Sequence, residues 1–152
     1  MSDAIELLKA DHRKVEALLK EIQELPDTAH ERRASICAQV SRELKAHDKI
    51  ETTIFYPALK AKTTPDTEPR DEVLEAYEEH ANIAGMLEKL AVTAPTDESY
   101  NAKLQVLGEL VKHHVKEEEH EMFKQARELL SESELKELGE RIEREKQQLV
   151  TA

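Results

Sequence analysis

The sequence predicts an all-α protein, an up-down-up-down four-helix bundle with an additional short C-terminal helix. Charged residues make up 36% of the chain and apolar residues 39%, with three glycines and no tryptophan. This composition, rich in Glu, Lys, Leu and Ala, is typical of helical proteins. Apolar residues recur every three or four positions, and prolines with small polar residues divide this pattern into five blocks.

Each block corresponds to one predicted helix. Short links that contain proline or small polar residues join the long helices, which favours antiparallel neighbours. A chain of 152 residues is expected to form one domain, residues 1–152, with the bundle over about residues 3–130. The five helices are expected at about residues 3–24, 28–60, 70–92, 98–130 and 132–150.

The ends of two helices carry capping signals. Ser2 is expected to cap the first helix, and Ser131-Glu132-Ser133-Glu134 resembles a capping box before the last one. The last helix has a narrow apolar stripe that could cover the bundle or form a dimer contact, so both a monomer and a homodimer stay open. The stripe consists of Leu135, Leu138, Ile142 and Leu149.

Charge and cysteine content exclude several classes of protein. A formal charge of -11 argues against nucleic-acid binding and against an anionic membrane surface, because both need basic residues. The single cysteine, Cys37, excludes an intrachain disulfide and a cysteine-rich metal site. The chain shows no signal peptide and no apolar run of membrane-spanning length, so we expect a cytoplasmic location without membrane partners.

Polar residues interrupt the apolar stripes of all four bundle helices. Each helix has one histidine in its stripe, and two helices add a glutamate one turn later. With a rise of about 1.5 Å per residue, antiparallel packing brings these side chains to a common layer of the core. They are His12, His47, Glu51, His80, His114 and Glu118.

This layer predicts a metal site. Any one of these histidines could be a hydrogen-bonded core residue, but two buried carboxylates would cost several kcal/mol and repel each other without a cation. Imidazole and carboxylate without thiolate suit iron, manganese or zinc. Six ligands exceed what one tetrahedral zinc ion takes, so two ions fit better.

The second and fourth helices contain related motifs. Residues 47–56 and 114–123 both read as histidine, three residues, glutamate and then an apolar pair one turn later. The first two and the next two helices are therefore expected to be related halves.

At these motifs the chain resembles the hemerythrin-like, or HHE cation-binding, family of four-helix non-haem di-iron proteins. The resemblance covers about residues 3–130 and depends on four motifs in order. They are Leu8-Lys9-Ala10-Asp11-His12, His47-x-x-x-Glu51 leading into Ile54-Phe55-Tyr56-Pro57, Glu79-His80, and His114-x-x-x-Glu118 leading into Met122-Phe123.

The resemblance implies two iron ions joined by an oxo or hydroxo bridge. His12 and His47 would bind one ion and His80 and His114 the other, with Glu51 and Glu118 bridging them. Glu119 competes with Glu118 as a bridge, because oxygen carriers of the family place that carboxylate one residue later. Asp11 would support a ligand or lie at the surface.

One position departs from the family pattern. Oxygen carriers have a fifth histidine where this chain has Ala84, and Tyr77, one turn before His80, could supply the missing ligand. The resemblance then implies that a small oxidant (dioxygen, peroxide or nitric oxide) binds at the incompletely ligated metal, and enzymatic turnover stays open. The alternatives are a metal-storage or zinc-stabilised bundle without redox chemistry, and an acidic interaction bundle whose core histidines are merely hydrogen-bonded.

Overall fold

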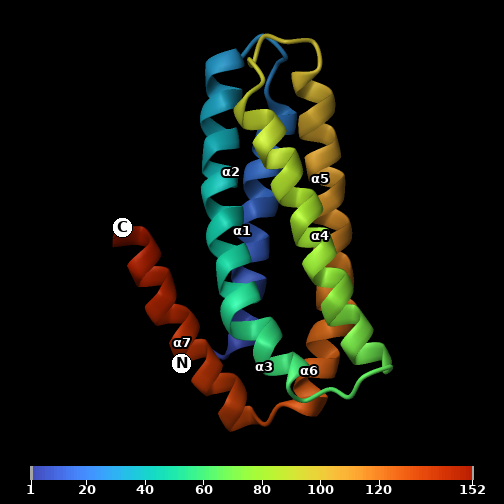
Figure 1. The fold of residues 1–152 in the computed structure, drawn as a ribbon. Helices are drawn as coiled ribbons and strands as arrows, with labels where there is room; N and C mark the ends of the chain where they lie inside the picture. Colours follow the sequence, from blue (N-terminus) through green and yellow to red (C-terminus); the bar gives the residue numbers. More distant parts are fainter. Residues whose placement is uncertain (1, 152) are drawn as a thin grey trace.

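The computed structural model describes residues 2–151 and consists of helices joined by short links. Its four long helices are α1 (Ala4–Glu24), α2 (His30–Ile50), α4 (Glu68–Ala91) and α5 (Tyr100–Glu117). They run alternately up and down, with α1 packed on α2 and α4 packed on α5 (Figure 1). The predicted up-down-up-down bundle is therefore confirmed.

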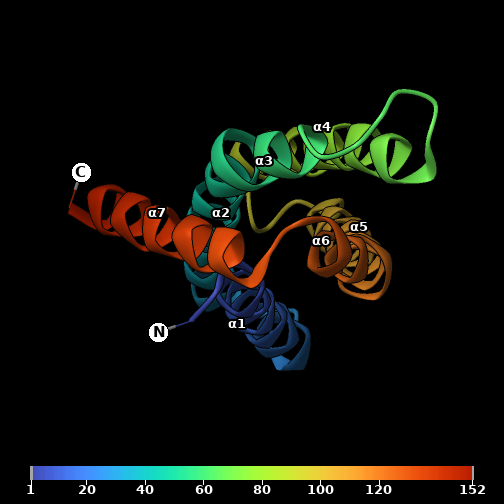
Figure 2. The same ribbon diagram turned by 90° about the horizontal axis from the view of Figure 1, so that it is seen from below.

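Two of the four antiparallel segments of the bundle change from α-helical to π-helical winding and back along their length. After α2 the chain makes one π-helical turn, η1 (Glu51–Phe55), and continues as α3 (Tyr56–Lys60). After α5 it makes a second π-helical turn, η2 (Glu118–Met122), and continues as α6 (Phe123–Leu129). Both turns begin at one of the two buried glutamates, and Figure 2 shows α3 and α6 at the same end of the bundle.

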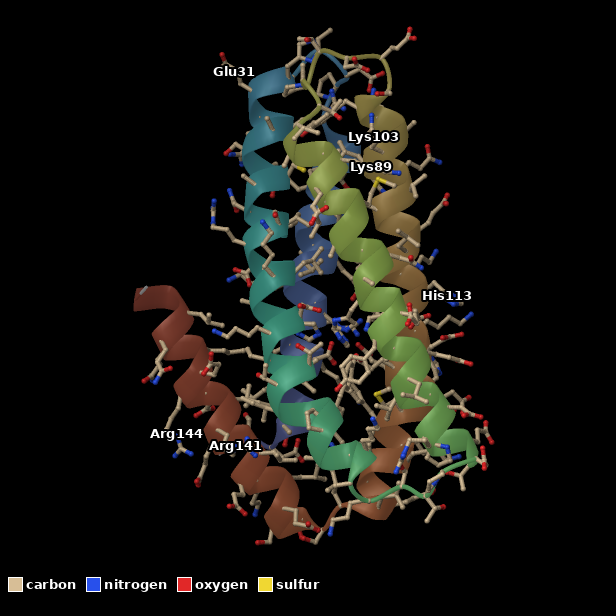
Figure 3. All side chains as sticks on the ribbon, viewed as in Figure 1. Glu31, Lys89, Lys103, His113, Arg141 and Arg144 are labelled. Atoms are coloured by element: carbon tan, nitrogen blue, oxygen red, sulfur yellow. The ribbon has the colours of Figure 1, made fainter. Side chains whose placement is uncertain are left out.

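The last helix, α7 (Glu132–Thr151), is 20 residues long and lies beside α1 and α2 at an angle to the bundle (Figure 1). Leu135, Leu138 and Ile142 are buried in the core of this chain, so the stripe covers the bundle. Arg141 and Arg144 are exposed charged residues of α7 (Figure 3).

The capping predictions had different outcomes. Ser131 and Glu134 form the expected capping box, in which each backbone N–H donates to the other residue's side chain. The prediction for α1 was wrong by one residue. Asp3 is the cap, and it forms a capping box with Glu6, because its carboxylate reaches the Glu6 N–H at 2.9 Å.

The core consists of two apolar clusters on either side of the polar layer. One cluster joins α7 to α1 and to the neighbouring ends of the other bundle helices, and includes Leu8, Phe55 and Phe123. The other joins α1, α2, α4 and α5, and includes Val40 and Leu107. Neither cluster contains the histidines and glutamates of the layer. Among the described residues, no helix is long and apolar enough to cross a membrane.

The close packing of α7 on the start of α1 depends on Gly139. A Cβ atom there would lie 2.7 Å from the Ser2 carbonyl oxygen and 3.1 Å from the Ala4 nitrogen, both of them backbone atoms. In α4, by contrast, a Cβ atom at Gly85 would meet nothing within 4 Å.

We therefore expect Gly139→Ala to lower the free energy of unfolding by about 1–2 kcal/mol, because overpacking outweighs the gain in helix propensity. Gly85→Ala, the matched control, should raise it by about 0.5–1 kcal/mol. Urea unfolding measures both values. A Gly139→Ala protein as stable as the control variant would contradict the packing of α7.

Candidate metal centre

The structure brings the six polar side chains of the layer together inside the bundle. All are buried, with exposed fractions between 0% and 8%. One histidine comes from each of the four long helices, and each glutamate is the first residue of a π-helical turn. The six residues are His12, His47, Glu51, His80, His114 and Glu118.

These side chains form two groups that share their carboxylates. His12 and His47 lie with both glutamates in one group, and His80 and His114 lie with the same two glutamates in the other. Within each group, one nitrogen or oxygen atom of every residue lies within 4.8 Å of the others. Each group could hold a cation, and each carboxylate could contact both cations.

The inner nitrogen of every histidine faces a carboxylate. In the first group Nε2 of His47 lies 2.8 Å from Oε1 of Glu51, and Nε2 of His12 lies 3.0 Å from Oε1 of Glu118. In the second group the Nε2 atoms of His80 and His114 each lie 3.1 Å from one of these carboxylates. All four Nε2 atoms therefore point at the same two side chains.

The outer nitrogen of every histidine is also held by a carboxylate. Such a contact fixes the ring and directs its other nitrogen, as carboxylate partners do for metal-binding histidines. Measured from Nδ1 to the carboxylate oxygen, the pairs are His12 with Glu119 (2.6 Å), His47 with Asp11 (3.0 Å), His80 with Asp48 (2.5 Å) and His114 with Glu79 (2.7 Å).

The inner atoms of the layer suit a cation better than they suit one another. Nε2 of His12, Nε2 of His47, Oε1 of Glu118 and both oxygens of Glu51 are buried and have no hydrogen-bond partner. Among them, Nε2 of His47 approaches Oε1 of Glu51 to 2.8 Å and Nε2 of His12 approaches Oε1 of Glu118 to 3.0 Å, without hydrogen-bond geometry. Orphaned donors and acceptors cost free energy in a core, and a metal ion between them would satisfy all five atoms.

The same contacts with carboxylates set the pKa values of histidines in the metal-free protein. Burial favours the neutral imidazole, but the carboxylate of Glu51 outweighs burial and raises the pKa of His47 to about 10. Hydrogen bonds to Asp48 and Glu51 likewise raise the pKa of His80 to about 9, and Glu118 raises the pKa of His114 to about 12. His47, His80 and His114 are thus held in their protonated form at neutral pH in the metal-free protein.

Metal binding to the metal-free protein should therefore release protons. A metal ion needs the neutral Nε2 atom, so at pH 7.5 it must displace protons whose pKa values lie at about 9 or above. Calorimetric titration in two buffers of different ionisation enthalpy measures this release. Equal heats in both buffers would contradict the protonated metal-free layer.

A tyrosine that the sequence analysis missed lies against the second group. The hydroxyl of Tyr56 is 2.9 Å from Nε2 of His80 and donates a hydrogen bond to the carboxylate of Glu118. Its ring lies edge-on to the ring of His80, with centroids 5.3 Å apart. Tyr56 is fully buried.

The π-helical turn explains this placement. The Tyr56 N–H donates to the carbonyl of Glu51, five residues earlier, and the Phe123 N–H donates to the carbonyl of Glu118. One extra residue per turn brings the fifth residue after each glutamate to the centre. Phe123 accordingly stacks on His12, with centroids 5.8 Å apart. The matching positions of Tyr56 and Phe123 in the two related motifs were the available signal.

The structure puts the other sequence candidates around the layer. Tyr77 is half-buried and packs its ring edge-on against Tyr56, with centroids 5.4 Å apart, so Tyr56 is the tyrosine whose hydroxyl meets the histidines. Glu119 holds the outer nitrogen of His12 and pairs with Arg13. Asp11 holds His47 and also accepts from Lys146 of α7.

Ala84 lies on a mainly apolar cavity of about 140 Å³ between α2 and α4. Leu44, Ile83 and Leu87 line its walls, and His47 and His80 are among the polar residues that line it. The position where the family pattern has a fifth histidine thus borders open space beside the histidines.

Comparison with known proteins agrees with this arrangement. The model of the family described as "Hemerythrin HHE cation binding domain" matches residues 3–126. The chain belongs to this family. The resemblance found in the sequence is thereby confirmed, and the family together with the two ligand groups makes this HHE domain a metal-binding protein.

A solved structure and several curated proteins are similar to this HHE domain. The crystal structure of an HHE domain-containing protein from Mycobacterium kansasii, a homologue of Rv2633c, has a TM-score of 0.84 and 29% identity, covering 99% of this chain and 90% of that one. The uncharacterized protein Rv2633c of Mycobacterium tuberculosis is 26% identical over 141 residues, or 92% of this chain and 83% of its own length.

A "DNA nickase" of Nostoc sp. is 26% identical over 127 residues, which is 83% of this chain. The matched region is 34% of the Nostoc protein, so this chain spans about a third of that relative. The similarity therefore extends to one part of a longer protein.

Proposed function

We propose that this HHE domain binds two iron ions and that a small oxidant binds at one of them. The observation that carries the proposal is that two fully buried carboxylates are shared between two pairs of histidines. In the proposed centre, His12 and His47 bind one ion, His80 and His114 bind the other, and Glu51 and Glu118 bridge them.

The sharing of carboxylates supports two ions rather than one. Each glutamate directs oxygen atoms at histidines from both groups, as Glu51 does toward His47 at 2.8 Å and toward His80 at 3.1 Å. A single ion could not engage all four Nε2 atoms and both carboxylates at tetrahedral coordination. Two ions bridged by carboxylates use every donor of the layer.

The ligand chemistry supports iron. Nitrogen and oxygen donors without sulfur suit iron, manganese or zinc, and a phenolate oxygen favours a ferric ion among these. The hydroxyl of Tyr56 lies beside His80, on the side of the centre where Ala84 replaces a histidine. Burial and the charges of Glu118 and Glu51 raise the pKa of Tyr56. Cations that neutralise these carboxylates would cancel the effect of their charges on the pKa of Tyr56 and so favour its ionised form.

An iron pair would supply redox chemistry with dioxygen, peroxide or nitric oxide. The protein's part is to hold the ions in a buried layer, to orient the histidines through their outer nitrogens and to admit small molecules. The cavity beside Ala84 suits a small neutral oxidant, because most of its lining is apolar. Turnover of the oxidant, a cytoplasmic location and the absence of nucleic-acid partners stay predictions.

Metal analysis of the aerobically purified protein tests the proposal. We expect about two irons per chain and near-ultraviolet bands from an oxo- or hydroxo-bridged pair. A colourless protein that contains zinc would favour the storage or structural alternative. A metal-free protein that also takes up no ferrous iron under anaerobic conditions would contradict the metal centre.

We propose Tyr56 as a tyrosinate ligand of the ion held by His80 and His114, which would give a visible absorption band, and substitution of tyrosines tests this assignment. Tyr56→Phe should keep two irons but lose the visible tyrosinate band, because it removes the hydroxyl that lies 2.9 Å from Nε2 of His80. Tyr77→Phe is the matched control and should keep the band, since Tyr77 packs behind Tyr56. Visible absorption and resonance Raman spectra of both iron-loaded variants measure this. A band lost in Tyr77→Phe and kept in Tyr56→Phe would reverse the assignment.

A further inference from the structure

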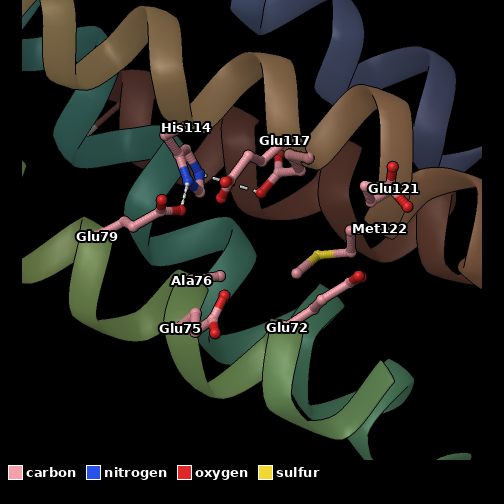
Figure 4. Close-up of a pocket in the computed structure, with 9 residues that line it drawn as sticks. Glu72, Glu75, Ala76, Glu79, His114, Glu117, Glu121 and Met122 are labelled. Atoms are coloured by element: carbon pink, nitrogen blue, oxygen red, sulfur yellow. Dashed lines mark hydrogen bonds and ion pairs between the residues drawn. The ribbon is translucent and has the colours of Figure 1, made fainter. Parts of the chain in front are cut away.

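A second opening reaches the layer from the opposite side of α4. It is a cavity of about 100 Å³ between α4 and the arm formed by α5 and η2. Figure 4 shows Glu72, Glu75 and Glu79 along α4, opposite Glu117 and Glu121. We name this cavity the acidic vestibule and define it by these five glutamates.

The acidic vestibule ends at the candidate metal centre. His114 and Glu118 belong to its lining, and both are ligands in the proposed centre. Glu118 is 2% exposed, and its Oε1 atom has no hydrogen-bond partner. Glu79 connects the two regions, because it lines the vestibule and holds Nδ1 of His114 at 2.7 Å.

Carboxylates come together at the outer end of the vestibule, and no lysine or arginine is among the described residues that line it. Oxygen atoms of Glu68, Glu72 and Glu121 lie within 4.8 Å of one another. Oε2 of Glu72 is buried and has no hydrogen-bond partner. Burial first, and then the charges of Glu68 and Glu121, raise the pKa of Glu72. A divalent cation would relieve this repulsion.

We propose that the acidic vestibule is the route by which ferrous iron enters the buried centre. Glu68, Glu72 and Glu121 would capture the hydrated cation at the surface, and the buried carboxylate of Glu118 would receive it inside. This inference rests on the proposed metal centre.

Because two of the three capturing residues are exposed, we expect a cation to bind there briefly and move on to the buried centre, and not to be stored there. Glu68 and Glu121 are exposed, and oxygen ligands in contact with water bind a divalent ion weakly and release it readily. The inner site offers histidine nitrogens as well, which bind ferrous iron more tightly than carboxylates alone. Affinity therefore rises along the path from Glu72 to Glu118.

The two cavities differ in charge, and this difference separates their roles. The cavity beside Ala84 is mainly apolar and suits a neutral oxidant, whereas the ionisable lining of the vestibule consists of glutamates and His114. A negative cleft with low-dielectric walls raises the association rate of cations, and salt weakens this effect.

The test compares metal-loading rates of two triple variants. Glu72→Gln, Glu75→Gln and Glu121→Gln together remove three of the five carboxylate charges that define the vestibule, without changing a proposed ligand or Glu79. Glu132→Gln, Glu137→Gln and Glu140→Gln change the net charge equally on the exposed face of α7 and serve as the control. Stopped-flow absorption would follow the uptake of cobalt(II) as a coloured probe and then of ferrous iron under anaerobic conditions.

We expect the vestibule variant to load about tenfold more slowly than wild type at low ionic strength, with the same final stoichiometry. The control variant should load at nearly the wild-type rate, and the difference should largely disappear in 1 M salt. Equal rates in all three proteins, each ending with two metals, would overturn the entry route and leave the metal centre intact. Failure of the wild type to take up metal would overturn both proposals.

Discussion

The arrangement of this bundle depends on two buried carboxylates, Glu51 and Glu118, that lie between four histidines. Each is too costly to bury alone, so the surrounding helices must bring positive charge or a cation to it. In the metal-free protein protonated histidines serve this purpose, and in the proposed centre two metal ions do. The apolar clusters above and below the layer then exclude water from it.

The same constraint explains the related halves of the chain. Asp11-His12 on α1 and Glu79-His80 on α4 each provide one inner histidine and one carboxylate that holds the histidine of the adjacent helix. Each half then unwinds by one π-helical turn at its glutamate. The halves differ where chemistry is expected, because the turn presents a tyrosine hydroxyl in one half and a phenylalanine ring in the other.

The helices and the six layer residues could be predicted because both follow from periodicity. An error of a few residues in a helix boundary shifts a side chain by only a few ångströms along the bundle, so the layer was still evident. Tyr56 could not be predicted in this way, since a π-helical turn precedes it and breaks the α-helical spacing on which the prediction depended. Tyr77 was predicted instead because α4 keeps that spacing. The acidic vestibule was also missed, because Glu117 belongs to a run of glutamates that resembles a solvated surface.

Anomalous diffraction from crystals of the aerobically purified protein at the iron absorption edge would test the central claim most directly. We predict two anomalous peaks, one beside the Nε2 atoms of His12 and His47 and one beside those of His80 and His114. Glu51 and Glu118 should lie between the peaks and contact both. A single peak, or none with the two carboxylates hydrogen-bonded only to the histidines, would contradict a bridged pair of iron ions.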